Sequence, residues 1–305
     1  MKILWILFFA FFVRVKAQVL EEEDFSKHID FIVFQNNQPF NTSLMASKNP
    51  VELGLCNEGD KLAVFTHGWT KNCSDPWVVG MVDMLTKHRG GCIICMDYSY
   101  YGNNQNYAIV VAQFPKIRDV LYDQMVNYGS YGFSPSNTYM YGHSYGAHLV
   151  LDAAANLGTQ VIKEIDVCDP AGIGFLPLSD PKLSAQNVQC IHTSSLVKGS
   201  IWRDCHQDWN MGICAIIQEG TGSFLGLGLE NGEMNSHARC PYVYNSAFEN
   251  NFPAIPKPLV CVLLNPLILN LATYPANFKM GYMETRKQQV SGNLYAKTSG
   301  SYPYN

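Results

Sequence analysis

Apolar positions along the chain alternate between short continuous runs and segments with helical spacing. The short runs, which predict buried strands, span residues 61–65, 92–97, 138–141, 164–167 and 187–193. Within 107–128 the apolar positions from Ile117 onward recur at i, i+3, i+4 and i+8, and 147–156 is rich in alanine, so both segments predict helices. Pro115 is expected to start or kink the first of them. This alternation predicts parallel β-α-β units in an α/β fold, with functional residues at the carboxyl ends of the strands.

Residues 1–17 have the pattern of a secretory signal peptide. Lys2 precedes a continuous apolar run, and Val15 and Ala17 lie three positions and one position before a cut ahead of Gln18. The run is too short to span a bilayer, which disfavours the alternative of an uncleaved anchor. We expect a secreted, extracellular protein in which residues 18–305 form a single domain.

Net charge limits the possible partners of the protein, and cysteine content predicts disulfides. The 305 residues carry a formal net charge of −4, which argues against a nucleic-acid partner and against strong attraction to anionic membranes. All ten cysteines follow residue 17, and an even number in a secreted chain predicts disulfides. Cys92 and Cys95 have the spacing of a redox or zinc pair, but they lie inside an apolar run, so a structural use is favoured.

The clearest chemical motif is Gly142-His143-Ser144-Tyr145-Gly146. An apolar strand precedes this Gly-x-Ser-x-Gly sequence and an alanine-rich helix follows it, as a nucleophile elbow requires. Glycine two positions before and after the serine allows the strand and the helix to pack closely. Ser144 is therefore the candidate nucleophile, whereas the alternative is a glycine-serine turn without chemistry.

Extended by Ala147-His148, this motif resembles the Gly-His-Ser-Leu-Gly-Ala-His signature of the pancreatic-lipase-like family, which includes triacylglycerol lipases, insect venom phospholipases A1 and fly yolk proteins. Most of residues 55–300 take part in the resemblance. Its further matches are Phe65-Thr66-His67-Gly68-Trp69-Thr70, Asp169-Pro170-Ala171-Gly172, Ile191-His192-Thr193, Ser236-His237-Ala238-Arg239 and Met280-Gly281-Tyr282. The resemblance implies an α/β-hydrolase fold, with a mostly parallel central sheet and helices on both faces.

A serine nucleophile needs a base and an orienting acid, which in α/β-hydrolases follow it in the order acid, histidine. Asp169 lies at the exit of the strand over 164–167 and matches the family's Asp-Pro-Ala motif, whereas Asp166 lies within the strand. His237 is similar to the histidine of the family's Cys-x-His-x-Arg. The other downstream histidines are His192, expected in the core, and His206, expected in a structural loop. We therefore expect a triad of Ser144, Asp169 and His237.

The developing oxyanion needs two backbone N–H donors. The N–H of Tyr145, directly after the nucleophile, is one candidate. By resemblance to the family, the N–H of Trp69 is the other, with Gly68 allowing a close approach of the backbone. The alternative for this segment is a plain strand-to-loop turn.

Leucine alternates with glycine shortly before His237. The alternative is a buried strand, but leucine alternating with glycine fills a core poorly. In the family that the chain resembles, the lid lies at this place in the sequence. The predicted lid covers 222–233 and includes Ser223, Phe224, Leu225, Leu227 and Leu229. The family's cysteine pair at the lid base is missing, since those positions fall near Thr221 and Asn235; Cys205 and Cys214 are a candidate substitute.

Short lids are found in the phospholipases of this family, so the resemblance favours a phospholipase A1 that releases the sn-1 fatty acid. The alternatives are a triacylglycerol or galactolipid lipase and a non-catalytic, yolk-like lipid-binding protein. We expect a lipid substrate at a membrane, micelle or emulsion surface, a monomer, no cofactor, no metal, no nucleic acid and no colipase. The segment 179–189 lacks the pairs with which some members bind a structural calcium.

Overall fold

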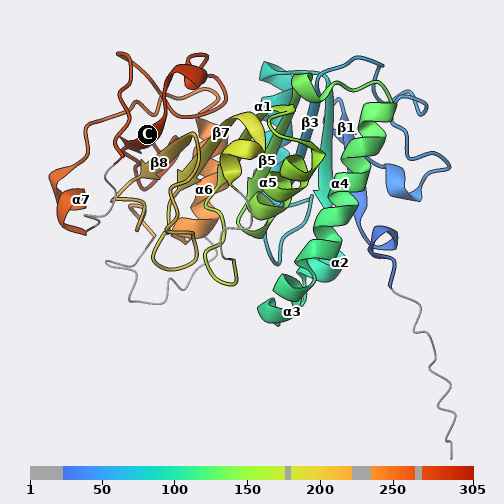
Figure 1. Ribbon diagram of the computed structural model, residues 1–305, viewed down its shortest axis with the longest axis horizontal. Coiled ribbons are helices and arrows are strands. Elements are labelled where there is room, and N and C mark those ends of the chain that lie inside the picture. Colours follow the sequence, from blue (N-terminus) through green and yellow to red (C-terminus); the bar gives the residue numbers. More distant parts are fainter. Residues whose placement is uncertain (1–22, 176–179, 222–234, 265–269) are drawn as a thin grey trace, which may run out of the picture.

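The computed structural model describes residues 23–175, 180–221, 235–264 and 270–305 (Figure 1). The predicted signal peptide and the predicted lid, including Ser223, Phe224, Leu225, Leu227 and Leu229, lie outside these residues. None of the helices in the described ranges is long and apolar enough to cross a membrane.

A nine-stranded sheet runs through the described part of the chain, in the order β2-β1-β4-β3-β5-β6-β7-β8-β9. The first two strands pair antiparallel with each other, β1 pairs antiparallel with β4, and the pairs from β4 to β9 are parallel. The strands are β1 (Asp30–Gln35), β2 (Gln38–Asn41), β3 (Leu62–Thr66), β4 (Cys92–Asp97), β5 (Thr138–His143), β6 (Ile162–Cys168), β7 (Ala185–His192), β8 (Gln207–Met211) and β9 (Gly292–Ala296).

Helices cover both faces of this sheet (Figure 1). The α-helices in the described ranges are α1 (Pro76–His88), α2 (Ser99–Gly102), α3 (Tyr107–Ala112), α4 (Phe114–Ser130), α5 (Tyr145–Leu157), α6 (Ser236–Ser246) and α7 (Leu259–Leu264), of which α1, α4, α5 and α6 pack on the sheet. In β3, Leu62 and Val64 pack with α4 and α5, while Ala63 and Phe65 pack with α1 and α6. Because both faces are buried, the central strands are continuously apolar in sequence. The predicted α/β-hydrolase architecture is confirmed.

The helix expected over 107–128 is two helices. Helix α3 ends at Ala112, Gln113 has φ −83° and ψ −6° as the cap of both, and Pro115 is the second residue of α4. Proline lacks an N–H and is tolerated only in the first turn of a helix. Pro115 was expected either to start or to kink a helix, and it starts one.

All ten cysteines form disulfides, which confirms the structural interpretation of Cys92 and Cys95. The pairs are Cys56–Cys92, Cys73–Cys95, Cys168–Cys240, Cys190–Cys205 and Cys214–Cys261. The suggested Cys205–Cys214 link is wrong. Cys205 precedes β8 and reaches the neighbouring strand β7, whereas Cys214 follows β8 and joins α7.

Candidate active site

Ser144 lies in a sharp turn between β5 and α5. Its φ of 58° and ψ of −120° are a strained conformation for a residue with a side chain. A Cβ on Gly142 would lie 2.4 Å from the Gly146 carbonyl oxygen, and a Cβ on Gly146 would lie 2.3 Å from that of His67. The two glycines therefore make this close packing possible, and the turn has the geometry of a nucleophile elbow.

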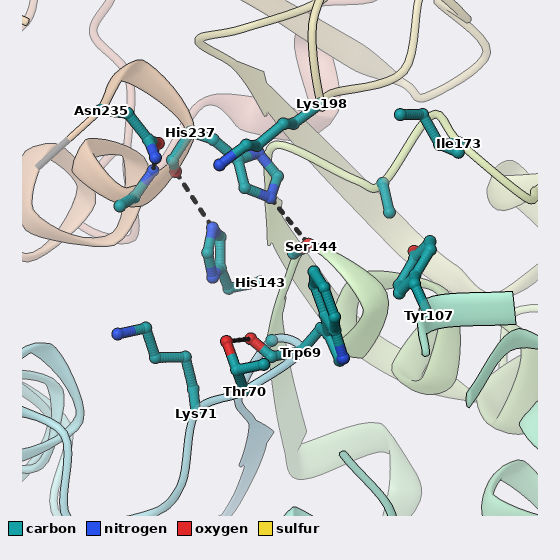
Figure 2. A pocket seen from close by; sticks show the side chains of 13 residues that line it. Trp69, Thr70, Lys71, Tyr107, His143, Ser144, Ile173, Lys198, Asn235 and His237 are labelled. Atoms are coloured by element: carbon teal, nitrogen blue, oxygen red, sulfur yellow. Dashed lines mark hydrogen bonds between the residues drawn. The ribbon is translucent and has the colours of Figure 1, made fainter. Parts of the chain in front are cut away.

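The three predicted triad residues form one hydrogen-bonded row. His237 Nε2 lies 2.7 Å from Ser144 Oγ (Figure 2), and His237 Nδ1 lies 2.5 Å from Asp169 Oδ2. Asp169 directly follows β6, and His237 lies in the first turn of α6. That turn is fixed by Asn235, whose side chain accepts a hydrogen bond from the Ala238 amide at 2.9 Å. All three triad side chains are largely buried.

A disulfide connects the segments that carry the acid and the histidine. Cys168 directly precedes Asp169, and its partner Cys240 lies one helical turn after His237. Burial alone would raise the pKa of Asp169. Hydrogen bonds from His237, Ser194 and the Thr193 amide outweigh it and hold the pKa well below its usual range. Asp169 is therefore an ionised carboxylate beside the imidazole.

The acidic and histidine residues that were not assigned to the triad have structural contacts. Asp166 lies within β6 and accepts hydrogen bonds from the Tyr244 hydroxyl and from the Gln189 side-chain amide; burial raises its pKa to about 7. His192 is buried with its Nε2 2.9 Å from Asp208 Oδ1, which confirms the expected core position. His206 Nδ1 accepts a hydrogen bond from the backbone N–H of Val188 at 3.1 Å. None of these groups is joined to Ser144 by a hydrogen bond within the described residues.

The Gly68–Trp69 backbone passes directly beside the nucleophile. A Cβ on Gly68 would lie 3.1 Å from Ser144 Cβ, so any other residue here would have to displace the nucleophile by a few tenths of an ångström. The backbone N–H groups of Trp69 and Tyr145, the two predicted oxyanion donors, have no hydrogen-bond acceptor among the residues that the structure describes. Two backbone donors without an acceptor among the described residues thus belong to the segments that pack beside the candidate nucleophile.

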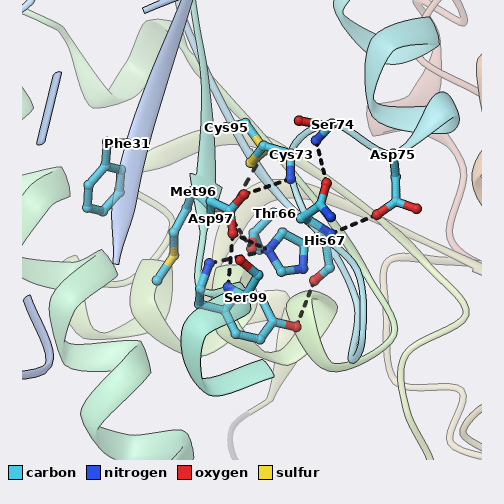
Figure 3. Close-up of a disulfide and its surroundings, with 12 residues drawn as sticks. Phe31, Thr66, His67, Cys73, Ser74, Asp75, Cys95, Met96, Asp97 and Ser99 are labelled. Atoms are coloured by element: carbon cyan, nitrogen blue, oxygen red, sulfur yellow. Dashed lines mark hydrogen bonds and ion pairs between the residues drawn. A yellow bond between two sulfur atoms is a disulfide. The ribbon is translucent and has the colours of Figure 1, made fainter. Parts of the chain in front are cut away.

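The end of β4 holds this loop in place (Figure 3). His67 Nε2 lies 3.3 Å from Asp97 Oδ1, and the Tyr98 hydroxyl donates to the His67 carbonyl at 3.0 Å. Asp97 Oδ2 accepts from the Cys73 amide at 2.9 Å, and Cys73 is joined to Cys95 of β4 by a disulfide. The loop is therefore attached to the sheet by hydrogen bonds and by a covalent link.

A pocket of about 490 Å³ opens onto Ser144 and His237. Its other lining residues are Gly68, Trp69, Thr70, Lys71, Tyr107, His143, Ala171, Ile173, Lys198, Asn235 and Ala238. In the view of Figure 2, the apolar side chains of Trp69, Tyr107 and Ile173 lie on one side of Ser144, and Lys71 and Lys198 lie on the other. The pocket combines an apolar wall with a cationic one.

Two residues that hydrogen-bond to triad residues, His143 and Ser194, were not predicted from the sequence. His143 Nε2 donates to the His237 carbonyl at 3.1 Å, and burial, reinforced by the charge of His237, lowers the pKa of His143 to about 3, so it is neutral. Its position inside the elbow motif was an available signal. Ser194 donates to Asp169 Oδ2 at 2.5 Å. The motif Ile191-His192-Thr193 directly precedes Ser194, but it did not point to a role for the Ser194 hydroxyl.

Hydrogen bonds connect residues that flank the predicted lid segment, near the positions where the resemblance places the family's cysteine pair. Thr221 Oγ1 lies 2.9 Å from Ser236 Oγ, which accepts from the Gln218 amide at 2.9 Å. Among the described residues, the one cluster with metal-ligand types is Cys190, Cys205 and Asp208, and its two sulfurs are bonded to each other. This cluster therefore does not fit a metal ion.

The sheet order, the elbow and the Ser144–His237–Asp169 row together define an α/β hydrolase. Among solved structures, esterase PE8 aligns with 45% of this chain and 70% of its own, with 16% identity and a TM-score of 0.36. The sequence model of the Lipase family matches residues 10–201, and the chain belongs to this family.

Curated relatives are pancreatic lipases. Horse pancreatic triacylglycerol lipase is 28% identical over 174 residues, which are 53% of this chain and 36% of the relative. Rat pancreatic lipase-related protein 2 is 29% identical over 178 residues, or 54% and 36% of the two chains. Human inactive pancreatic lipase-related protein 1 is 25% identical over 178 residues, with the same coverage. The matches thus span little more than a third of these relatives.

Proposed function

We propose that this chain is a secreted lipid carboxyl-ester hydrolase with a Ser144–His237–Asp169 triad, carried on a single domain over residues 18–305. The observation that carries the proposal is the continuous hydrogen-bonded row from Ser144 Oγ through both nitrogens of His237 to Asp169, beside a partly apolar pocket. The five disulfides support an extracellular location.

The reaction follows from the positions of these groups. Ser144 Oγ attacks the ester carbonyl carbon while His237 Nε2 takes the hydroxyl proton, and Asp169 stabilises the imidazolium through Nδ1. The Trp69 and Tyr145 amides donate to the oxyanion. The C–O bond to the alcohol then breaks, and His237 returns its proton to that leaving group. Water, deprotonated by His237, then attacks the acyl carbonyl carbon. The bond to Ser144 Oγ breaks, His237 returns the proton to Oγ, and the fatty acid is released.

For the substrate, we favour the sn-1 ester of a phospholipid over a triacylglycerol. An acyl chain fits against Trp69, Tyr107 and Ile173, and a phosphate fits near Lys198 on the opposite side of Ser144. Burying an unpaired phosphate would cost several kcal/mol, so a cationic, open side of the pocket suits a phospholipid. The short predicted lid points the same way. The pancreatic triacylglycerol lipases among the relatives support a triacylglycerol lipase as the second candidate.

The test compares phosphatidylcholine vesicles with a triolein emulsion, using substrates labelled separately in the sn-1 and sn-2 chains. We expect 2-acyl lysophospholipid and the sn-1 fatty acid, with Ser144→Ala as the inactive control. Lys198→Gln should raise KM for phosphatidylcholine and leave the hydrolysis of a short, uncharged ester unchanged. Triolein hydrolysis without lysophospholipid would favour the neutral lipase. Stoichiometric lipid binding with no hydrolysis of either substrate would favour a non-catalytic lipid carrier.

A further inference from the structure

The carboxylate of Asp169 accepts more hydrogen bonds than a triad requires. Oδ1 accepts from the backbone N–H groups of Thr193, at 2.7 Å, and Ser194, at 3.1 Å. Oδ2 accepts from His237 Nδ1 and also from the Ser194 hydroxyl, both at 2.5 Å. The imidazole and the serine hydroxyl therefore share a single carboxylate oxygen.

The Ser194 hydroxyl has one available direction. It is fully buried, its oxygen accepts a hydrogen bond from the Gly199 amide at 3.2 Å, and it also lies 3.4 Å from His237 Nδ1. Since Nδ1 donates its own hydrogen to Asp169, the Ser194 hydrogen is directed to the carboxylate. Gly199 itself packs against the carboxylate, since a Cβ there would lie 2.5 Å from Asp169 Oδ1. Ser194 thus contacts the carboxylate beside His237, while Gly199 packs against its other oxygen.

We infer that Ser194 is a positioning residue, whose hydroxyl fixes the orientation of the Asp169 carboxylate and takes up part of the negative charge on the oxygen that faces His237. This inference rests on the proposed hydrolase function. Without that hydroxyl, the carboxylate has one donor fewer to define its rotation, and Oδ2 carries more charge toward the imidazole. Two changes follow: a smaller kcat, and a stronger stabilisation of the imidazolium form of His237.

The matched comparison is Ser194→Ala against Ser195→Ala. Ser195 is the next residue, is also buried, and accepts a hydrogen bond from Arg203 Nη2 at 2.7 Å instead of contacting the acid. Ser194→Ala should lower kcat on a soluble ester about tenfold with KM unchanged, as the loss of one hydrogen bond to a charged group predicts. Ser195→Ala should change kcat by less than about twofold.

The pH profile separates positioning from a general loss of packing. In Ser194→Ala the acid limb of kcat/KM should move to higher pH, because the imidazolium form is then favoured. Among the described residues, the other ionisable groups near the pair are His143 of β5, His192 of β7, Arg203 from the loop after β7, and Lys198, which lines the pocket with His237. None of the four is hydrogen-bonded to the Ser194 hydroxyl in the described part of the chain. Their contributions should therefore stay the same in Ser194→Ala, whereas Ser195→Ala also removes the hydrogen bond from Arg203.

Two further measurements complete the test. The low-field proton NMR signal of His237 Nδ1–H should shift in Ser194→Ala and stay in place in Ser195→Ala, and this readout does not require hydrolysis. A wild-type protein without activity would thus refute the proposed function while the signal still tests Ser194. Ser194→Thr keeps the hydroxyl and should stay within about threefold of wild-type kcat. Equal effects of the two alanine variants on kcat and on this signal, or a threonine variant as impaired as Ser194→Ala, would overturn the inference.

Discussion

Replacing Gly146 with alanine tests the close packing of the elbow against the neighbouring loop. The new Cβ would lie 2.3 Å from the His67 carbonyl oxygen and 3.0 Å from the Thr66 carbonyl oxygen. Contacts below 3.0 Å essentially never occur at a Cβ, so the backbone must separate by at least about 0.7 Å. Overpacking of this kind typically costs about 1–3 kcal/mol of the free energy of unfolding, which leaves a stable domain folded.

The position of the clash determines the effect on activity. His67 lies two residues before Trp69, and Gly146 directly follows Tyr145, so either backbone that moves carries one of the two proposed oxyanion donors with it. A displacement of about 1 Å costs on the order of 10²-fold in rate, and complete loss of one donor costs about 10²–10³-fold. We therefore expect kcat of Gly146→Ala to fall about 10²-fold with KM nearly unchanged.

The assay is steady-state hydrolysis of a soluble p-nitrophenyl ester, with thermal unfolding measured in parallel. Gly129→Ala is the matched control, because Gly129 lies in α4 and a Cβ there has nothing within 4 Å. It should keep wild-type kcat and gain about 0.5–1 kcal/mol, since alanine favours the helix. A folded Gly146→Ala protein with kcat within threefold of wild type would refute the proposed role of these amides.

Three further outcomes are expected. Ser144→Ala should lower turnover by on the order of 10⁶ while lipid binding and the melting temperature persist; near-normal esterase activity would exclude this nucleophile. Burial lowers the pKa of His148 to about 4, below an unfolded value near 6.5, so this residue's stability contribution is full above pH 6.5 and is lost as the pH falls toward 4. In urea unfolding, His148→Gln should therefore lose up to about 3 kcal/mol less than wild type between pH 7 and pH 4, and an equal loss would contradict this. Dialysis against EDTA should leave activity and melting temperature unchanged, and a loss that calcium restores would reveal a metal site.

The central strands were predictable because both of their faces are buried. The five apolar runs agree with β3 to β7 within two or three residues at their ends. Strand β8 was not predicted, since it is buried and yet polar. Its Asp208 pairs with His192, and its Asn210 accepts from Arg203 at 2.9 Å. Such long-range compensation of buried polar groups leaves no periodic signal in the sequence.

Residues of the candidate site were predictable from the sequence alone only where they lie in a recognisable local motif. Ser144 lies in a strand-turn-helix motif, and Asp169 lies at a strand exit, so local sequence marks both. The identification of His237 and Trp69 relied on resemblance to the family, because their approach to Ser144 depends on contacts between distant segments. Ser194 donates to Asp169 across 25 residues of chain, and a hydroxyl in such a place is not distinguishable from other serines in the sequence.

The Cys168–Cys240 disulfide has a consequence for the cost of assembling the site. It closes a loop with a sequence separation of 72 residues, whose ends carry Asp169 and His237. Closing a loop of that length removes about 4 kcal/mol of chain entropy from the unfolded state. Most of the entropic cost of bringing the acid and the histidine together is therefore met when the bond forms during oxidative folding. A chain that folds in a reducing compartment lacks this constraint, so formation of a single covalent bond links the assembly of the site to an oxidising environment.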